Sequence, residues 1–264
     1  MSDFDLLLFG VDPALVQAAT GAGVDGIVVD WENAGKRLRQ ADADTEVNHH
    51  TAADLSRVRA ATDRLVICRI DSVPRGGLEH VEAAIALGAD ELLVPMARRR
   101  EELEAVIDAA SGRCGVGMLI ETAEAAAAPE QFAGLKLRRV YVGLNDLAIE
   151  RRSRGIFDAL VDGTVDRARR AVDVPFGVAG LTLPEAGQPV PCRLLIAEMA
   201  RLRCGFGFLR RSFLRDVPRH RMGHAVPRIK AAVVAAAAAP QPSLERRHHA
   251  LRAMLDTPAV KVAT

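Results

Sequence analysis

The sequence of 264 residues has few aromatic side chains and no excess of charge of either sign. Aromatic residues make up 4% of the chain, which is too little for the stacking surfaces that bind single-stranded nucleic acid. The formal net charge is +1, so no basic field favours nucleic acid or an anionic membrane surface. We therefore expect neither nucleic acid nor a membrane among the partners of this protein.

Cysteines are few, and long apolar runs are missing. Cys68, Cys114, Cys192 and Cys204 are scattered without a CxxC pair, which predicts free thiols and disfavours a zinc site or a disulfide framework. The apolar run over residues 231–239 is too short to cross a bilayer. The first ten residues have no basic segment before their apolar run, unlike a secretory signal. These features predict a cytoplasmic protein.

Eight short apolar runs recur along the chain, and each is followed by a segment of helical character. Their hydrophobicity is nearly continuous, which is typical of strands buried on both faces of a parallel sheet. Eight such units predict an α/β fold of the (β/α)8 barrel type. A doubly wound open sheet is the alternative, which the lack of a glycine-rich dinucleotide fingerprint disfavours. The predicted strands are Leu6–Gly10, Gly26–Glu32, Leu65–Asp71, Glu91–Met96, Val116–Thr122, Val140–Asp146, Phe176–Thr182 and Gly205–Arg210.

We expect one barrel domain over residues 1–239, and a linker with one further helix over residues 240–264. The segment 244–255 in this tail has the amphipathic pattern of a helix, which could pack on a neighbouring subunit but is too short to be a domain. Thr51 and Asp12 are candidate N-caps of earlier helices. The long connections after the second and sixth strands should lie on the carboxyl-terminal face, where barrels bind substrates.

Polar side chains gather where the predicted strands end, which is where barrel enzymes carry their functional groups. Glu121 and Asp146 are separated by about one strand–helix unit, so their carboxylates should converge. A buried carboxylate is costly unless it is paired, and a metal ion would be such a partner. The strand-end residues are Asp30, Glu32, Arg69, Asp71, Glu121, Asn145 and Asp146.

Two carboxylate ligands, with water and substrate in the other positions, are typical of Mg²⁺, and Mn²⁺ and Co²⁺ accept such sites. The metal would polarise the carbonyl of a 2-oxo acid and stabilise an enolate, while Arg69 would bind the substrate carboxylate or the enolate oxygen. Each residue also has a purely structural interpretation. Glu121 could bond the next helix, Asp146 could be an N-cap, and Arg69 could neutralise Asp71 or Glu32.

Five segments, in order, resemble the HpcH/HpaI aldolase and citrate lyase beta-subunit family of the phosphoenolpyruvate/pyruvate superfamily. They are IVVDWENAGK, CRID, GADELLVPM, GMLIETAEA and VYVGLNDLAIE, and the likeness extends from Val24 to Leu214. The resemblance implies a modified (β/α)8 barrel whose last helix is exchanged between subunits. It also implies a homo-oligomer, a trimer or a hexamer.

The resemblance further implies that a carbon–carbon bond is made or broken through a pyruvate-type or acyl-CoA enolate. It implies metal ligands at Glu121 within IETAEA and at Asp146 within GLNDL. It implies a substrate-binding arginine at Arg69 within CRID. The other predicted substrate-binding residues are Asn145, Glu32 and Asn33.

One position departs from the pattern of this family. Its pyruvate aldolases carry a histidine after the acidic residue that ends the second strand, whereas here Asn33 follows Glu32. Asparagine cannot transfer a proton at neutral pH, but histidine can. We therefore expect His50, in the long connection after the second strand, or a metal-bound water to move the proton.

Three functions are compatible with these residues. The first is a divalent-metal-dependent class II aldolase or lyase that uses a 2-oxo acid and an aldehyde. The second is an enzyme of the citrate lyase or malyl-CoA lyase type, with Arg151, Arg152 and Arg154 as candidate ligands of the CoA phosphates, or a condensing enzyme that forms a tricarboxylate from oxaloacetate. The third is a non-catalytic relative that binds metal and oxo acid, since a fold does not fix a function.

Overall fold

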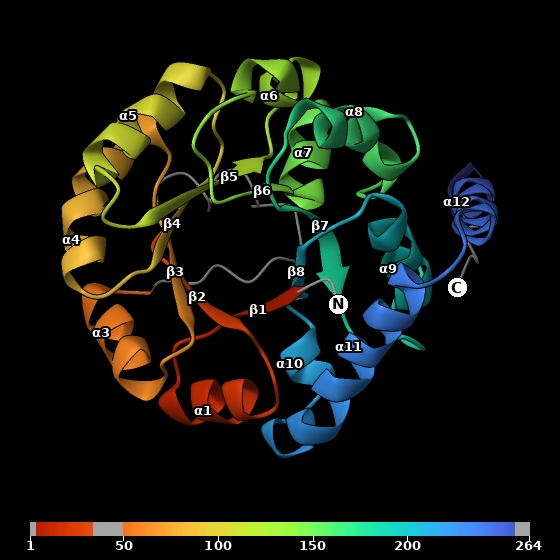
Figure 1. Ribbon diagram of the computed structural model, residues 1–264, viewed down its shortest axis with the longest axis horizontal. Helices are drawn as coiled ribbons and strands as arrows, with labels where there is room; N and C mark the ends of the chain where they lie inside the picture. Colours follow the sequence, from red (N-terminus) through yellow and green to blue (C-terminus); the bar gives the residue numbers. More distant parts are fainter. Residues whose placement is uncertain (1–3, 34–49, 257–264) are drawn as a thin grey trace, which may run out of the picture.

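The structure is a computed structural model that describes residues 4–33 and 50–256. Eight parallel strands form a closed barrel in sequence order, and β8 pairs with β1 to close it (Figure 1). The predicted (β/α)8 barrel is confirmed, and the doubly wound alternative is wrong. The strands are β1 Asp5–Phe9, β2 Gly26–Asp30, β3 Leu65–Arg69, β4 Glu91–Val94, β5 Gly115–Ile120, β6 Arg139–Val142, β7 Phe176–Leu181 and β8 Phe206–Leu209.

Helices surround the barrel and follow the strands in turn (Figure 1). The α-helices are α1 Pro13–Gly21, α3 Ala52–Ala61, α4 His80–Ala86, α5 Arg100–Ala110, α6 Ala123–Ala127, α7 Leu144–Arg151, α8 Thr164–Ala171, α9 Cys192–Arg201, α10 Phe213–Asp216, α11 Met222–Ala237 and α12 Gln241–Asp256. Short 3₁₀ turns join some of them: η1 Val73–Arg75, η2 Gly77–Glu79, η3 Pro129–Phe132, η4 Asp158–Leu160 and η5 Arg219–Arg221.

Several strands end earlier than their apolar runs predict. The sixth was predicted to reach Asp146, but β6 ends at Val142 and α7 begins at Leu144. Leu144 and Leu147 are buried helical residues, so hydrophobicity continues past the strand and hides its end. Asp146 therefore lies in the first turn of α7, not in the strand to which the sequence assigned it.

Both predicted N-caps are confirmed. The side chain of Asp12 accepts a hydrogen bond from the backbone N–H of Leu15 at 2.7 Å. Thr51 and Asp54 form a reciprocal capping box, in which the Asp54 carboxylate accepts the backbone N–H of Thr51 at 2.6 Å. These side chains satisfy backbone donors that a helix start would otherwise leave unpaired.

The interior of the barrel is apolar in its middle and ionic at its amino-terminal end. The middle is filled by Leu7, Val28, Ile67, Leu93, Leu119, Phe206 and Phe208. Below them, Nε of Arg139 bonds both carboxylate oxygens of Glu91 at 2.8 and 2.9 Å, and its guanidinium lies 4.9 Å from the centre of the Phe206 ring. Burial raises the pKa of Glu91, and Arg139 opposes that rise. This buried pair closes the amino-terminal end.

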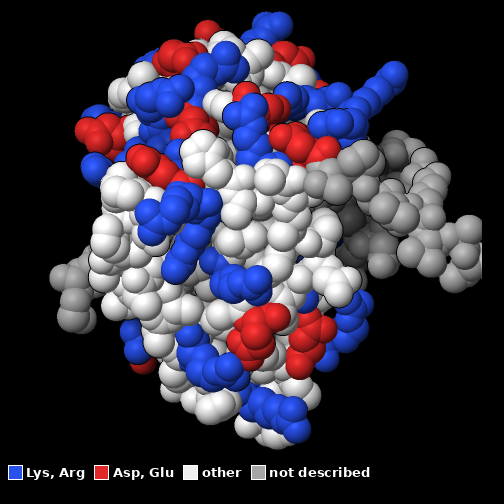
Figure 2. Space-filling view, turned by 90° about the vertical axis from the view of Figure 1, so that its right-hand side faces the viewer, with Lys and Arg blue, Asp and Glu red and all other residues white. Residues whose placement is uncertain are grey.

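The C-terminal helix α12 packs against α9 of its own chain. Leu244 and Leu251 are buried, and Nδ1 of His248 lies 3.0 Å from Oε2 of the buried Glu198. The side of the molecule with α9, α11 and α12 carries a largely uncharged band crossed by basic side chains, with both signs of charge above and below it (Figure 2). The exchange of this helix between subunits is not tested by a single chain and stays a prediction.

The four cysteines are free, as expected. None of the helices over residues 4–33 and 50–256 combines the length and the apolar character that crossing a bilayer requires.

Candidate active site

A cavity of about 690 Å³ opens at the carboxyl-terminal ends of the strands. Its wall combines the aromatic residues Phe9, Tyr141, Phe157 and Phe208 with two acidic and four basic side chains. The charged residues come from different strands and loops, which the closed barrel brings together. They are Arg69, Glu121, Asp146, Arg210, Arg211 and Arg215.

Glu121 and Asp146 both line this cavity, as the sequence predicts. Glu121 directly follows β5 and is 4% exposed, and its Oε2 accepts the backbone N–H of Met96 at 3.3 Å. Burial, followed by the negative charges of Asp146 and Glu32, raises the pKa of Glu121 to about 8, against the opposing effect of Arg69. The two carboxylates are therefore close enough to repel each other.

Gly143 makes room for the Glu121 carboxylate. A Cβ at this position would lie 2.9 Å from Cδ of Glu121 and closer still to its Oε1 and Cγ. Any side chain at residue 143 would displace the carboxylate, because real Cβ contacts essentially never fall below 3.0 Å. Gly143 directly precedes α7, so the same glycine leads into the helix that carries Asn145 and Asp146.

Arg69 also lines the cavity, and its guanidinium is held by two acidic residues, Asp30 and Glu32. Its Nε and one terminal nitrogen bond the two oxygens of Asp30 at 2.9 and 2.7 Å, and its other terminal nitrogen lies 3.4 Å from Glu32. Asp30 and Arg69 are register partners on β2 and β3, so the parallel pairing itself sets this contact. The structural alternative for Arg69 named Asp71 or Glu32 as its partner; the structure shows a contact with Glu32 and shorter bonds to Asp30.

Of the remaining predicted site residues, only Asn145 lines the cavity; Glu32, Asn33 and His50 do not. The backbone N–H of Asn33 donates to Asp71 at 2.9 Å, and its side chain donates to the carbonyl of Trp31 at 3.2 Å. Nδ1 of His50 accepts the backbone N–H of Asp30 at 2.9 Å. Glu32 and His50 therefore contact the Asp30–Arg69 pair, whereas Asn33 bonds Asp71 and Trp31, and the roles of all three stay predictions.

Besides Arg69, the arginines Arg210, Arg211 and Arg215 line the cavity, and Arg210 and Arg211 follow β8 as Thr182 follows the neighbouring β7. Arg210 ends the predicted eighth strand and Arg211 follows it, but the sequence does not give the orientation of either side chain. Burial and the positive charge of Arg69 lower the pKa of Arg211, whereas Asp146, Asp30 and Glu121 act against this shift. The only sequence signal for these residues is their position directly after a buried strand.

A two-carboxylate metal site fits these residues. Over residues 4–33 and 50–256, no group of three or more histidine, cysteine, aspartate or glutamate side chains could hold a metal ion. Mg²⁺ usually takes one or two carboxylates and completes its shell with water and substrate, so Glu121 and Asp146 suffice. The raised pKa of Glu121 reflects unfavourable negative charge, which a divalent cation between the two carboxylates would offset.

The predicted CoA-phosphate ligands lie outside this cavity. Arg151 donates to Asp162 at 2.7 Å and to Thr164 at 2.9 Å. Arg154 lines a separate cavity of about 260 Å³ with Arg252 and Asp256 of α12. The geometry therefore does not connect these arginines with the carboxylate pair.

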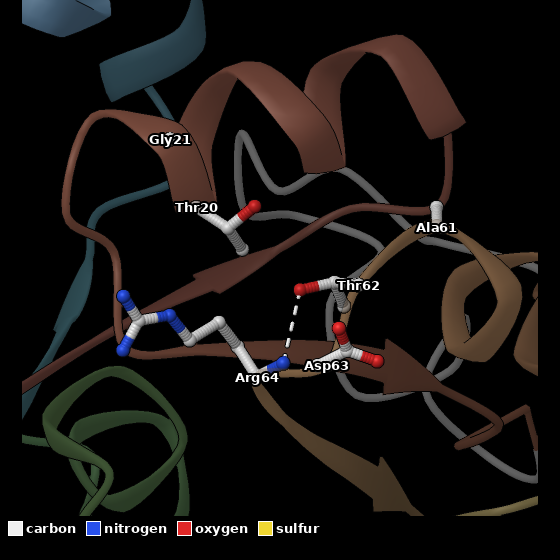
Figure 3. A pocket seen from close by; sticks show the side chains of 6 residues that line it. All are labelled: Thr20, Gly21, Ala61, Thr62, Asp63 and Arg64. Carbon is white, nitrogen blue, oxygen red and sulfur yellow. Dashed lines mark hydrogen bonds between the residues drawn. The ribbon is translucent and has the colours of Figure 1, made fainter.

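Another cavity, of about 500 Å³, lies near the carboxyl-terminal ends of α1 and α3 and the start of β3, at the amino-terminal end of the barrel. Figure 3 shows the charged ends of Asp63 and Arg64 pointing in opposite directions, while the backbone N–H of Arg64 donates to Thr62 at 3.1 Å. Its polar groups do not converge on one point, so the cavity at the other end of the barrel is the candidate active site.

Comparisons with known proteins identify a family and a fold. The family model described as HpcH/HpaI aldolase/citrate lyase matches residues 5–152, which include Arg69, Glu121 and Asp146. A search of functionally curated proteins gives no match.

Solved structures of similar fold include an HpcH/HpaI aldolase from Desulfitobacterium hafniense DCB-2, with 16% identity, a TM-score of 0.61, and coverage of 81% of this chain and 90% of that one. The citrate synthase SbnG has 18% identity and a TM-score of 0.58, covering 79% of this chain and 86% of its own. A protein of the HpcH/HpaI aldolase/citrate lyase family from Burkholderia cenocepacia J2315 has 14% identity and a TM-score of 0.59, covering 79% and 88%. At these identities the likeness shows the fold.

Proposed function

Because the chain belongs to the HpcH/HpaI aldolase/citrate lyase family, we propose that it is a divalent-metal-dependent aldolase or lyase that acts on the enolate of pyruvate or a related 2-oxo acid. The observation that carries the proposal is the convergence of Glu121, Asp146 and Arg69 on one cavity at the carboxyl-terminal ends of the strands. The two carboxylates would hold a divalent cation, and this cation together with the fixed guanidinium of Arg69 would stabilise a developing oxyanion.

Glu121 and Asp146 would hold Mg²⁺, Mn²⁺ or Co²⁺. The cation would supply Lewis-acid polarisation of the substrate carbonyl, which lowers the barrier to removing a proton or cleaving a bond next to it. The protein's part is to keep both carboxylates in place. The N–H of Met96 bonds Glu121, and the first turn of α7 positions Asp146.

Arg69 would bind the substrate carboxylate or the oxygen on which negative charge develops. Its bidentate contact with Asp30 fixes the plane of the guanidinium, so its remaining N–H groups need little reorganisation when substrate binds. Lysine could not reproduce this geometry, because an ammonium has no planar fork. Asn145 lies next to Asp146 on the same wall and would contribute an amide to substrate binding.

His50 remains the proposed acid–base residue on the side of the second substrate, although it is not part of the cavity lining. Its Nδ1 accepts the backbone N–H of Asp30, so a neutral His50 carries its proton on Nε2. This contact ties the imidazole to the strand end that also supports Arg69. The second substrate would be an aldehyde or an acyl-CoA, and we expect the protein to be a homo-oligomer.

Metal binding and turnover together test this function. We expect Mn²⁺ to bind the wild-type protein in a calorimetric titration, and Glu121→Gln or Asp146→Asn to weaken binding by about 10- to 100-fold, because each substitution removes one of two charged ligands. Cleavage or condensation with 2-oxo acids should fall in parallel. A matched control is Glu124→Gln. Glu124 lies on α6, and its exposed carboxylate pairs with Arg98.

The proposal is wrong if Glu121→Gln and Asp146→Asn keep wild-type metal affinity and full metal-dependent activity. Weaker metal binding in both variants, with the Glu124→Gln control unchanged, would support it.

A further inference from the structure

The cavity wall contains a threonine and two arginines that have no role in the proposed binding of the metal ion or in the contacts of Arg69. Thr182 follows β7, and Arg210 and Arg211 follow β8, so neighbouring strands deliver all three to the cavity. The pairing of β7 with β8 has a register shift between Gly177 and Gly180, which the sequence did not predict.

Two buried polar atoms of this group have no hydrogen-bond partner. Across the part of the chain that the structure describes, Thr182 Oγ1 and Arg210 Nε are the only buried side-chain nitrogen or oxygen atoms in this condition. Thr182 is 1% exposed, and both residues line the same cavity. Buried polar atoms are almost always paired, so two exceptions side by side in one cavity wall point to a ligand that both would contact.

Arg211 adds a cation without a direct counter-ion. Within residues 4–33 and 50–256, no hydrogen bond or ion pair of its guanidinium is found, whereas Arg210 bonds Asp216 at 2.7 Å. Arg69 is already matched by Asp30 and Glu32. A cation held between Glu121 and Asp146 would neutralise the acidic part of the wall, so the positive charge of Arg211 would remain to attract an anion.

We propose that Thr182, Arg210 and Arg211 form a subsite for an anionic group, a carboxylate or a phosphate, of the second substrate. The guanidinium of Arg211 would pair with the anion, while the hydroxyl of Thr182 and Nε of Arg210 would donate to it. The inference deepens the proposed function, on which it rests for the role of the other end of the cavity. It makes the second substrate a charged molecule rather than a neutral aldehyde.

The test measures anion binding without requiring turnover. Succinate and inorganic phosphate are titrated calorimetrically into wild-type protein in the presence of Mg²⁺, and again in the presence of a chelator. We expect one of the two to bind. Arg211→Gln should weaken that binding about tenfold or more, and Thr182→Val should weaken it several-fold, because a charge-assisted bond and a hydroxyl donor are lost.

The matched control is Arg219→Gln, which removes a cation outside the cavity. The Arg219 side chain is 58% exposed, so its substitution should leave binding unchanged. Thermal melting of each variant checks that it folds. Tighter binding of succinate would indicate a carboxylate-bearing substrate, and tighter binding of phosphate a phosphorylated one.

The proposal is overturned if neither anion binds the wild-type protein, or if Arg211→Gln and Arg219→Gln affect binding equally. Because no chemical step is measured, anion binding that depends on Arg211 would persist even if the enolate function proved wrong. Conversely, normal metal binding and turnover without anion binding would remove only the subsite.

Discussion

Glu121 is a buried carboxylate whose charge is opposed by its own surroundings. Its pKa rises to about 8 in the folded chain from an ordinary value of 4.5, first because of burial and then because of Asp146 and Glu32. Between these two values the folded state binds more protons than the unfolded state. The free energy of unfolding of the metal-free protein should therefore fall as the pH rises through this window, and stay low above it.

This pH dependence can be measured by urea denaturation at a series of pH values with a chelator present. Glu121→Gln has no proton to lose, so its stability should fall less across the window, and at high pH the variant should be more stable than the wild-type protein. An equal change of the free energy of unfolding with pH in the two proteins would contradict the raised pKa of Glu121.

Gly143 supports the same carboxylate by its lack of a side chain. Gly143→Ala should weaken metal binding about tenfold or more, because the added Cβ would overlap Glu121 and displace it. Calorimetric titration with Mn²⁺ measures the effect. The control is Gly223→Ala in α11, where an added Cβ meets nothing within 4 Å and an alanine should stabilise the helix slightly. Unchanged metal affinity in Gly143→Ala would show that the carboxylate position does not matter.

Single positions in the sequence identified the carboxylates and Arg69 of the site, but not the group of Thr182, Arg210 and Arg211. Glu121, Asp146 and Arg69 directly follow strands or lie close to their ends, so period and spacing suffice to place them in one cavity. Thr182 and Arg211 have equivalent positions, but their use depends on side-chain orientation beside an irregular β7–β8 pairing. Asp30 was visible at a strand end, yet its pairing with Arg69 required the register of β2 and β3.

At the scale of elements, caps were easier to predict than strand ends. A threonine followed three residues later by an aspartate is a local pattern, and the Thr51–Asp54 capping box forms as a local structure. No local pattern marks the end of β6, because the buried apolar residues of α7 continue its hydrophobic run. Only three-dimensional packing distinguishes the strand from the helix. The connection over residues 34–49 lies outside the described residues, so the predictions about that loop stay untested.

The capping box gives a prediction for α3. Thr51→Ala should lower the free energy of unfolding by about 1 kcal/mol, because the side chain of Thr51 caps the backbone N–H of Asp54. Chemical denaturation measures the change. Ser56→Ala, on the exposed face of the same helix, should be neutral or slightly stabilising. A loss in both variants of the same size would mean that general helix propensity, not the cap, is responsible.

At the scale of the whole molecule, the closed barrel follows from eight buried strands with helices between them. Each strand pairs in parallel with its neighbours in sequence, so their carboxyl-terminal ends meet on one face. The Arg139–Glu91 pair closes the opposite end, which leaves the cavity face as the place where substrate can enter. The architecture depends on many residues at once, so the nearly continuous hydrophobicity of the eight runs was enough to predict it. The site depends on only a few residues.

The central claim is that this cavity generates an enolate with the help of a divalent cation. The most direct measurement follows the methyl protons of pyruvate by NMR in D₂O, with the protein and Mg²⁺ or Mn²⁺, and again with a chelator. The account predicts exchange of these protons that requires the metal, and that is lost in Glu121→Gln and Asp146→Asn. Exchange that persists in the chelated protein or in both variants would contradict it.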